Sequence, residues 1–348
     1  TVDEDTLQFL AYEQCFKNAL TGQPIGGGKG GSNFDPKGRS DNEIMRFCQA
    51  FMRELHRHIG ANVDVPAGDI GVGGREIGYL YGQYMKITKL RDGSMSGKPL
   101  GMGGLLGRTE ATGYGAVTFV EQMLKHRSEE LEGKRVAISG AGNVALYAAE
   151  LAREKGAQVV SLSDSGGALI CENGFSEEQV EELIDFKESQ RGRLKDWEGD
   201  GCAFFREDKP WSHVDHDVAL PCATQHEIEE EDAKTIADRG CQFVAEGANM
   251  PCTHRARGVF LDKGVTFGPG KAANAGGVAT SCFEMHQNAS HDAWTKERAL
   301  DKLNEVMLHI HEQCVEHAPE ENGIVNYGAG ADRAGFIKLA DTIVAMGV

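Results

Sequence analysis

The sequence predicts an α/β protein of two domains, one of which is a doubly wound parallel sheet with helices on both faces. Its 348 residues are enough for two domains with separate cores, and a chain with 40% hydrophobic and 26% charged residues is typically globular. In the second half, short β-branched runs alternate with helical patterns, which is the order that a parallel sheet requires. The 45 glycines are too many for an all-helical protein and suit a fold with many tight turns.

The first half predicts helices separated by polar loops, and we assign residues 1–104 to one α/β domain. Apolar side chains at helical spacing predict helices at 5–20, 41–59 and 76–85, the second with an acidic N-cap. Between the last two, valines that alternate with polar residues indicate a turn-and-strand segment over 62–76. The glycine-rich stretch 93–107 has no periodicity, so we interpret it as a linker between domains.

The second half predicts the doubly wound sheet, which we assign to residues 105–278. Strands are expected at 135–139, 158–162, 218–220, 243–245 and 265–267, with helices at 109–126, after residue 143 and at 177–190. From Ser281 on the pattern is helical, and residues 279–348 are expected to return as C-terminal helices that complete the first domain.

Charge and cysteine usage limit the partners and the compartment. The net charge of −17 disfavours nucleic acid and anionic membranes, and no apolar run approaches the roughly 18 residues of a membrane span. The nine cysteines never form C-x-x-C, which argues against a zinc site and favours a reducing compartment such as the cytoplasm. The helical pattern starts at Thr1, so we expect the chain to begin inside a longer one, and an upstream organellar targeting segment stays open.

A glycine-rich turn follows the first expected strand of the sheet. Residues 140–145 read GAGNVA, which fits G-x-G-x-x-G/A in the strand–turn–helix context that gives this pattern its meaning. Gly140 permits the tight turn, Gly142 lets the backbone approach a pyrophosphate, and the final alanine lets the helix pack on the sheet. The helix N-terminus then favours phosphate, so we assign Asn143 and Val144 to the same dinucleotide site.

An acidic residue, Asp164, ends the next expected strand a little over twenty positions further on. A carboxylate at this place accepts the ribose 2′-OH of NAD and repels the 2′-phosphate of NADP. Taken alone, Asp164 therefore favours NAD.

A second glycine-rich segment, PIGGGKGGSNFDPKGRSD, covers residues 24–41 and surrounds Lys29. A P-loop would need a glycine at Gln23 and a hydroxyl residue at Gly30, so that template fails at both ends. The alternative is an amine held against a small substrate. A lysine that acts as a base near neutral pH needs its pKa lowered from about 10.4 to about 7–8, which desolvation and nearby cations supply.

Six motifs run in order along nearly the whole chain. They are YEQCFKNAL (12–20), PIGGGKGGSNFDPKGRSDNEIMRFCQAF (24–51), DVPAGDIGVGGREIGYLYGQY (64–84), RTEATGYG (108–115), EGANMP (246–251) and KAANAGGVATS (271–281). Together they resemble the glutamate dehydrogenase family in its hexameric, microbial-type branch. The resemblance implies reversible oxidative deamination of L-glutamate to 2-oxoglutarate and ammonia, a nicotinamide coenzyme and a homohexamer.

The resemblance also implies roles for particular residues. Lys29 would be the catalytic amine and Asp69 its proton-transfer partner. The substrate site would be completed by Gln14, Lys17 on the α-carboxylate, the backbone of Gly68 and the hydroxyl of Ser281. The coenzyme would contact Thr112 and Asn143, with Asn249 and Asn274 near its nicotinamide end.

For the coenzyme, the resemblance disagrees with the charge rule. Ser163, Asp164 and Ser165, followed by two glycines, are similar to the S-D-S-x-G of NADP-dependent members, in which serines and a lysine of the next helix bind the phosphate. Lys187 matches that lysine. We therefore expect NADP(H), with NAD(H) as the alternative.

One family motif has no counterpart here. The family carries another substrate lysine in a K-G-G-x-R-type segment before the first helix of this chain, which leaves Ser281 as the remaining γ-carboxylate contact. We expect the full-length protein to be active and the 348-residue chain alone to fail in an assay of 2-oxoglutarate amination.

Three alternatives stay open. A branched-chain or aromatic amino-acid dehydrogenase would share the two-domain plan but would prefer an apolar residue in place of Ser281. A catalytically inactive, nucleotide-binding structural subunit would have no need of Lys29 and Asp69. A metal-binding or regulatory module is suggested by histidine pairs, but two of the pairs have i, i+2 spacing and point apart on a helix, so we expect no metal. These pairs are 56/58, 213/216 and 309/311.

Overall fold

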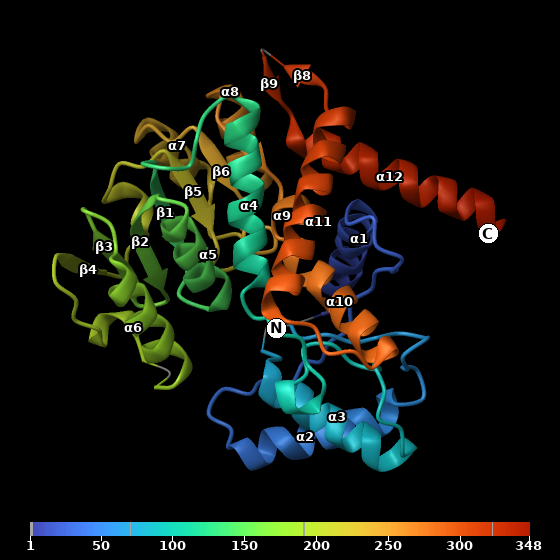
Figure 1. Cartoon of the computed structure of the whole chain (residues 1–348). Helices are drawn as coiled ribbons and strands as arrows, with labels where there is room; N and C mark the ends of the chain where they lie inside the picture. Colours follow the sequence, from blue (N-terminus) through green and yellow to red (C-terminus); the bar gives the residue numbers. More distant parts are fainter. Residues whose placement is uncertain (1–2, 70, 191, 322) are drawn as a thin grey trace. The chain divides into compact units, whose positions relative to one another are not determined.

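The structure is a computed structural model that describes residues 3–69, 71–190, 192–321 and 323–348 (Figure 1). The chain divides into two compact units. The first comprises Thr1–Tyr12, Gly28–Thr109 and Gly277–Leu303, and the second comprises Glu13–Gly27, Glu110–Gly276 and Asn304–Val348.

The second unit is built on a seven-stranded sheet with the order β4-β3-β2-β1-β5-β6-β7. Its strands are β1 (Arg135–Ser139), β2 (Gln158–Asp164), β3 (Gly167–Cys171), β4 (Cys202–Arg206), β5 (Val218–Pro221), β6 (Phe243–Ala245) and β7 (Thr266–Gly268). Strands β2, β1, β5, β6 and β7 pair in parallel, and β3 and β4 add an antiparallel edge. The strand order reverses at β1, which has β2 on one side and β5 on the other, and such a switch point is where α/β sheets bind ligands.

Helices cover both faces of this sheet because side chains alternate between the faces along each strand. Ala137 of β1, Val244 of β6 and Phe267 of β7 pack in one core with α7 (Glu230–Asp238) and α8 (His254–Asp262). The neighbouring Gly268 faces the other way and lies against Phe119 of α4 (Ala111–His126), which runs beside α5 (Asn143–Glu154) (Figure 1). The α/β, doubly wound fold that we predicted is confirmed.

The first unit has a largely helical core. Met52 of α2 (Asp41–Leu55) packs with Ile77 and Tyr81 of α3 (Gly74–Thr88), and all three side chains are buried. The capping box of α2 is formed by Ser40, whose Oγ accepts from Glu43 N at 3.3 Å and whose N–H donates to Glu43 Oε2 at 2.8 Å. The N-cap is therefore Ser40 and not the acidic residue that we predicted, although acidic residues do occupy the first turn.

The turn-and-strand segment predicted over 62–76 does not form a strand among its described residues, from which Ile70 is missing. It pairs only through isolated bridges, Ile59 with Asp64 and Asp69 with Val72. Val63 is 71% exposed, so the alternation that suggested a half-buried strand does not reflect burial. The glycine-rich stretch 93–107, which we expected to link the domains, lies within the first unit.

The remaining elements are α1 (Glu4–Leu20), the 3-10 turn η1 (Leu100–Met102), α6 (Glu177–Glu188), the 3-10 turns η2 (Leu194–Asp196) and η3 (Pro210–Ser212), α9 (Gly270–Ala273), α10 (Gly276–Ser290), α11 (Lys296–His317), β8 (Glu320–Glu321), β9 (Ile324–Val325) and α12 (Tyr327–Met346). Among the residues described, no helix combines the length and the apolar character that crossing a membrane requires.

Candidate active site

The turn between β1 and α5 has the backbone that a dinucleotide site needs. Gly140 has φ +92°, and a Cβ on it would stand 2.9 Å from the Cys222 carbonyl oxygen just after β5. Gly142 is the extended N-cap of α5, yet a Cβ there would meet no atom within 4 Å. Because the fold itself does not need a glycine at 142, the open space before this helix N-terminus fits a pyrophosphate.

The start of α5 presents the residues that the motif predicted. Asn143 is exposed, Val144 is half-buried, and the following Ala145 is fully buried, which lets the helix pack on the sheet. Helix α4 approaches closely, because a Cβ on Gly113 would stand 2.5 Å from the Val144 carbonyl oxygen. Thr112, which is half-buried, directly precedes Gly113 in α4 and therefore lies near the first turn of α5.

The carboxylate of Asp164 is already occupied by the protein. Its Oδ1 accepts from Gly166 N at 2.8 Å and its Oδ2 accepts from Leu194 N at 3.0 Å. Lys187 Nζ lies 3.8 Å from the same Oδ2, and the Asp164 side chain is only 9% exposed. The charge rule for NAD assumes a free carboxylate, and Asp164 is not one.

Three donors lie at this end of β2. Ser165 is exposed, and the Nη1 of Arg193 donates to its Oγ at 2.6 Å. Burial lowers the pKa of Lys187, and the carboxylate of Asp164 opposes that shift. Arg193 was not among our predicted site residues, and the signal that could have found it is the basic run RGRLK at 191–195.

Ser163 has a different position from Ser165. Its side chain is buried, and its Oγ accepts a hydrogen bond from Gly140 N at 2.9 Å. Ser163 therefore stabilises the glycine turn through a buried hydrogen bond, whereas Ser165 faces solvent.

In the second unit, Lys17 of α1 joins the two asparagines expected near the nicotinamide. The Nζ of Lys17 donates to Asn249 Oδ1 at 2.9 Å, and Asn274 Nδ2 donates to the same oxygen at 3.1 Å. Asn274 is 4% exposed, and its Oδ1 has no hydrogen-bond partner in the described part of the chain. A buried amide oxygen of this kind fits a donor from a ligand, such as the carboxamide of a nicotinamide.

Gln14 lies one helical turn before Asn18 on α1 and donates to its Oδ1 at 2.7 Å. Asn18 in turn donates to the carbonyl oxygen of Gly26. Gln14 is thus connected to the start of the glycine segment that leads to Lys29.

In the first unit, the Nζ of Lys29 forms an ion pair with the carboxylate of Asp69. The Lys29 side chain is mostly buried, whereas Asp69 is exposed. A Cβ on Gly28 or Gly30 would meet no atom within 4 Å, so the backbone on both sides of Lys29 is open to a ligand. Gly68 is held differently, because a Cβ there would stand 2.6 Å from the Val72 carbonyl oxygen.

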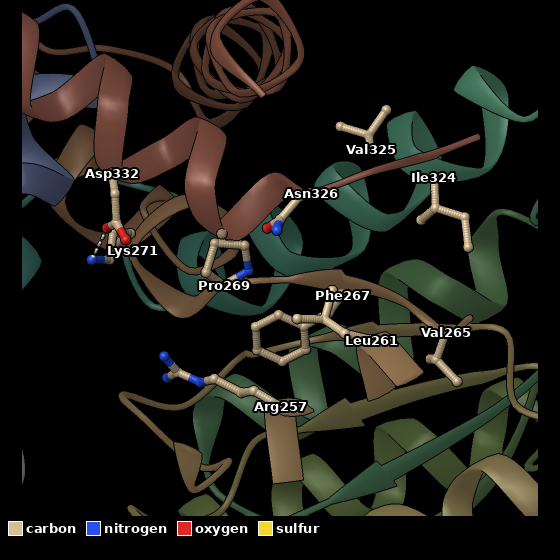
Figure 2. A pocket seen from close by; sticks show the side chains of 11 residues that line it. Arg257, Leu261, Val265, Phe267, Pro269, Lys271, Ile324, Val325, Asn326 and Asp332 are labelled. Carbon is tan, nitrogen blue, oxygen red and sulfur yellow. Dashed lines mark hydrogen bonds and ion pairs between the residues drawn. The ribbon is translucent and has the colours of Figure 1, made fainter. Parts of the chain in front are cut away.

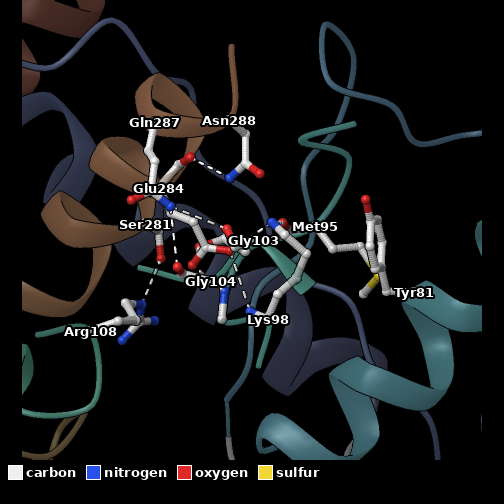
Figure 3. A network of polar contacts seen from close by, with 12 residues as sticks. Tyr81, Met95, Lys98, Gly103, Gly104, Arg108, Ser281, Glu284, Gln287 and Asn288 are labelled. Atoms are coloured by element: carbon white, nitrogen blue, oxygen red, sulfur yellow. Dashed lines mark hydrogen bonds and ion pairs between the residues drawn. The ribbon is translucent and has the colours of Figure 1, made fainter. Parts of the chain in front are cut away.

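Ser281 of α10 is paired with an arginine that sequence reasoning missed. The Nε of Arg108 donates to Ser281 Oγ at 3.2 Å (Figure 3). Ser281 Oγ in turn donates to Gly277 O at 3.1 Å. Burial lowers the pKa of Arg108, and the carboxylates of Glu284 and Asp69 act in the opposite direction. A guanidinium beside a hydroxyl suits a carboxylate ligand. The available signal was that Arg108 opens the motif RTEATGYG.

The predicted residues thus form groups within each unit. Lys29, Gly68, Asp69 and Ser281 belong to the first unit. Gln14, Lys17 and all the predicted coenzyme residues belong to the second.

A cavity of about 110 Å³ elsewhere in the second unit is lined by none of the predicted residues (Figure 2). Its cationic groups are already paired, Lys271 with Asp332 at 2.6 Å and Arg257 with Glu246 at 3.2 Å. Its lining otherwise includes apolar side chains such as that of Phe267. Because its lysine and arginine are neutralised by carboxylates, the cavity is poorly suited to an anionic ligand.

The histidine pairs do not build a metal site in the described residues, where no three His, Cys, Asp or Glu side chains are grouped as ligands would be. His213 instead bonds Asp208 at 2.9 Å, and His311 bonds the hydroxyl of Tyr327 at 3.0 Å.

Comparison with known proteins gives the family. Residues 103–347 match the Glutamate/Leucine/Phenylalanine/Valine dehydrogenase family, and residues 1–86 match the Glu/Leu/Phe/Val dehydrogenase dimerisation domain. The NADP-specific glutamate dehydrogenase of Escherichia coli is 52% identical over the whole chain and 78% of its own length, and the NAD-specific glutamate dehydrogenase of Bacteroides fragilis is 49% identical with the same coverage.

The solved structures agree. The glutamate dehydrogenase of Plasmodium falciparum superposes with a TM-score of 0.97 at 48% identity, over all of this chain and 75% of its own. The hetero-hexameric glutamate dehydrogenase of Thermus thermophilus gives a TM-score of 0.88 at 25% identity, over all of this chain and 80% of its own. The chain belongs to the glutamate/leucine/phenylalanine/valine dehydrogenase family and, within it, to the glutamate dehydrogenases that its motifs predicted.

Proposed function

We propose that the protein catalyses the reversible oxidative deamination of L-glutamate to 2-oxoglutarate and ammonia with NADP(H). The observation that carries this proposal is the ion pair between Lys29 and Asp69, an amine and a carboxylate in direct contact on a segment flanked by glycines. The names of the relatives give the substrate class, since they are glutamate dehydrogenases.

Lys29 and Asp69 supply proton transfer. Deamination needs a base that removes protons from the reacting groups and a second group that passes them on. Because the Nζ of Lys29 touches the carboxylate of Asp69, a proton moves between them without a bridging water. Hydride exchange with the substrate Cα is the chemistry that the coenzyme would supply when bound.

Two cationic groups would serve the two carboxylates of the substrate. Lys17, which is 9% exposed and bonded to Asn249, would bind the α-carboxylate. Arg108 and Ser281 would bind the γ-carboxylate, because the Arg108 guanidinium, which lies beside the Ser281 hydroxyl, has donors for both of its oxygens. Gln14 and the backbone of Gly68 would contact the rest of the molecule.

The coenzyme would lie on the turn at Gly140 and Gly142, with its nicotinamide end towards Asn249 and Asn274. Relatives of nearly equal identity are named NADP-specific and NAD-specific, so overall identity does not choose between the coenzymes. The donors at Ser165, Lys187 and Arg193 support NADP, since Asp164 is bonded within the protein.

The test of the function is a substrate panel with the protein as its gene encodes it. With NADP⁺, L-glutamate is expected to exceed L-leucine, L-valine and L-phenylalanine in kcat/KM by about 10⁴-fold, because a site built to bond a polar group rejects analogues that lack it. A preference for valine, leucine or phenylalanine would establish the branched-chain or aromatic alternative. Binding of NADPH without turnover of any of these would establish the structural-subunit alternative.

Replacing Arg193 with alanine is expected to lower kcat/KM for NADPH by about 10- to 100-fold, the range for a hydrogen bond to a charged group. NADH has no 2′-phosphate, so its kcat/KM should stay within about twofold. Initial rates of 2-oxoglutarate amination with each coenzyme measure both values. Arg255→Ala removes an exposed arginine from α8 and is the matched control. Equal losses with NADH and NADPH would contradict the assignment of the phosphate site.

We also propose a homohexamer in a reducing compartment such as the cytoplasm. The Thermus relative is named a hetero-hexamer, and residues 1–86 match a dimerisation domain. All nine cysteines are free. Sedimentation equilibrium should give six times the mass of the encoded chain, and a monomer would refute the assembly.

A further inference from the structure

A buried carboxylate, Glu284 of α10, accepts hydrogen bonds from three consecutive residues of the glycine-rich stretch (Figure 3). Its Oε2 accepts from Gly97 N at 2.9 Å and from Ser96 Oγ at 3.3 Å. Its Oε1 accepts from Lys98 N at 3.3 Å and from Lys98 Nζ at 2.6 Å. Both charged side chains are 0% exposed.

Stability alone does not account for this pair. Two charges removed from water lose their hydration, and buried ion pairs in proteins can often be replaced by apolar residues without loss of stability. Two of the donors here are backbone N–H groups of Gly97 and Lys98, so the carboxylate fixes the path of the main chain. The Nζ of Lys98 also donates to Met95 O and lies 5.6 Å from the ring centre of Tyr81, which anchors it to the helical core.

The turn that Glu284 holds is bonded to the segment that carries Asp69. Ser96 N donates to Pro66 O at 2.9 Å. Gly97 has φ +80°, and a Cβ on it would stand 3.7 Å from Gly68 N. The contacts therefore run from Glu284 through residues 96–97 to residues 66–68, next to the partner of Lys29.

The Asp69 segment needs such support from outside. Residues 65–68 belong to no helix or strand, and the backbone of Asp69 forms an isolated bridge with Val72. On α10, Ser281 lies three residues before Glu284 and accepts from Arg108. One helix thus holds the Arg108–Ser281 pair directly and the Asp69 segment through Glu284.

We propose that Glu284, paired with Lys98, is a positioning residue that places Asp69 against Lys29. This inference rests on the proposed function. Glu284 touches neither Lys29 nor Asp69 by hydrogen bond or ion pair, so it acts through the 96–98 turn. Loss of its acceptors displaces Asp69 and slows proton transfer, and it leaves the coenzyme residues of the second unit unchanged.

The discriminating variant is the double replacement Lys98→Met/Glu284→Leu. It removes both charges and so avoids an uncompensated buried ion, but it also removes both Glu284 oxygens that accept from the turn. We expect kcat for glutamate oxidation to fall by about 10²-fold, the cost of misplacing a reacting group by about 1 Å, with KM for NADP⁺ within twofold of wild type. Glu284→Gln keeps one oxygen to accept from Gly97 N and should lose less.

The matched control is Lys134→Met/Glu129→Leu, an ion pair of 2.7 Å in the second unit that touches no predicted site residue. Its kcat is expected to remain at the wild-type level. Hydrogen exchange is the readout that does not depend on activity. The 64–72 peptide should exchange faster in the Lys98/Glu284 double variant, while the midpoint of urea unfolding stays near that of wild type.

The outcomes separate the inference from the function on which it rests. A double variant with wild-type kcat and wild-type exchange in 64–72 would overturn the positioning role. If the wild-type enzyme does not oxidise glutamate, the proposed function fails, and the exchange of 64–72 alone then decides the role of Glu284. Faster exchange confined to 64–72 and 96–98 would support it, and unchanged exchange would refute it.

Discussion

Lys29→Met is expected to lower kcat for glutamate oxidation by about 10³-fold, within the range that a positioned acid–base group contributes. The variant keeps the length of the side chain but has no nitrogen to exchange a proton with Asp69, its ion-pair partner. The coenzyme residues lie in the other unit, so the Kd for NADPH should remain within about twofold. Steady-state rates and fluorescence titration of NADPH measure the two quantities.

Lys29→Arg separates proton transfer from charge. Arginine keeps a cation beside Asp69 but does not lose its proton in a protein, so this variant should be as slow as Lys29→Met. Lys37→Met removes an exposed lysine from the same segment and is the control. A Lys29→Arg enzyme with more than a tenth of the wild-type kcat would show that residue 29 acts by charge alone.

Gly276→Ala is expected to destabilise the protein strongly. A Cβ on Gly276 would stand 2.1 Å from the Ala111 carbonyl oxygen and 3.2 Å from Gly115 Cα. Both neighbours are backbone, so the start of α10 or of α4 must move, and we expect a loss of about 3 kcal/mol, the upper end for overpacking. Urea unfolding followed by circular dichroism measures the loss as an earlier midpoint.

Gly258→Ala provides the control for that prediction. Gly258 lies inside α8, and a Cβ on it would meet no atom within 4 Å. Alanine is favoured over glycine in a helix by about 1 kcal/mol, so this variant should unfold at equal or higher urea concentration than wild type. If Gly276→Ala and Gly258→Ala unfold at the same urea concentration, the close approach of α10 to α4 is not rigid.

The central strands could be predicted because each is a short apolar run that ends in a turn. β1, β2, β5, β6 and β7 all satisfy this pattern, and all five lie in the parallel part of the sheet. Strand β3 was missed although it follows β2, one of its two antiparallel partners, after a short turn. The edge strand β4 was missed because it pairs with β3 across a separation of some thirty residues. Sequence spacing carries no signal for such a pairing, and Phe205 of β4 is 37% exposed.

The sequence pattern also failed to show an interruption between the C-terminal helices. The pattern from Ser281 onward predicted helices to the end of the chain, but the short hairpin of β8 and β9 separates α11 from α12. Two-residue strands are too short for any periodicity to register.

For the site, motifs located the residues but not their partners. The glycine turn at 140–145 could be predicted because each glycine has a role in the backbone, and the neighbouring strand and helix patterns indicate that role. Arg108 and Arg193 were missed as site residues because their relevance comes from Ser281 and Ser165, which lie 173 and 28 residues away in the chain. Only the folded chain brings these donors together.

The bonded state of Asp164 bears on how coenzyme use changes between lineages. Since this acid caps two backbone N–H groups, it is part of the scaffold, and its presence says little about which cosubstrate evolution selected. An ancestor could have exchanged one dinucleotide for the other through substitutions at 187 and 193 while the aspartate stayed in place. Enzymes named for opposite preferences, each about half identical to this chain, are what such an easy exchange would leave behind.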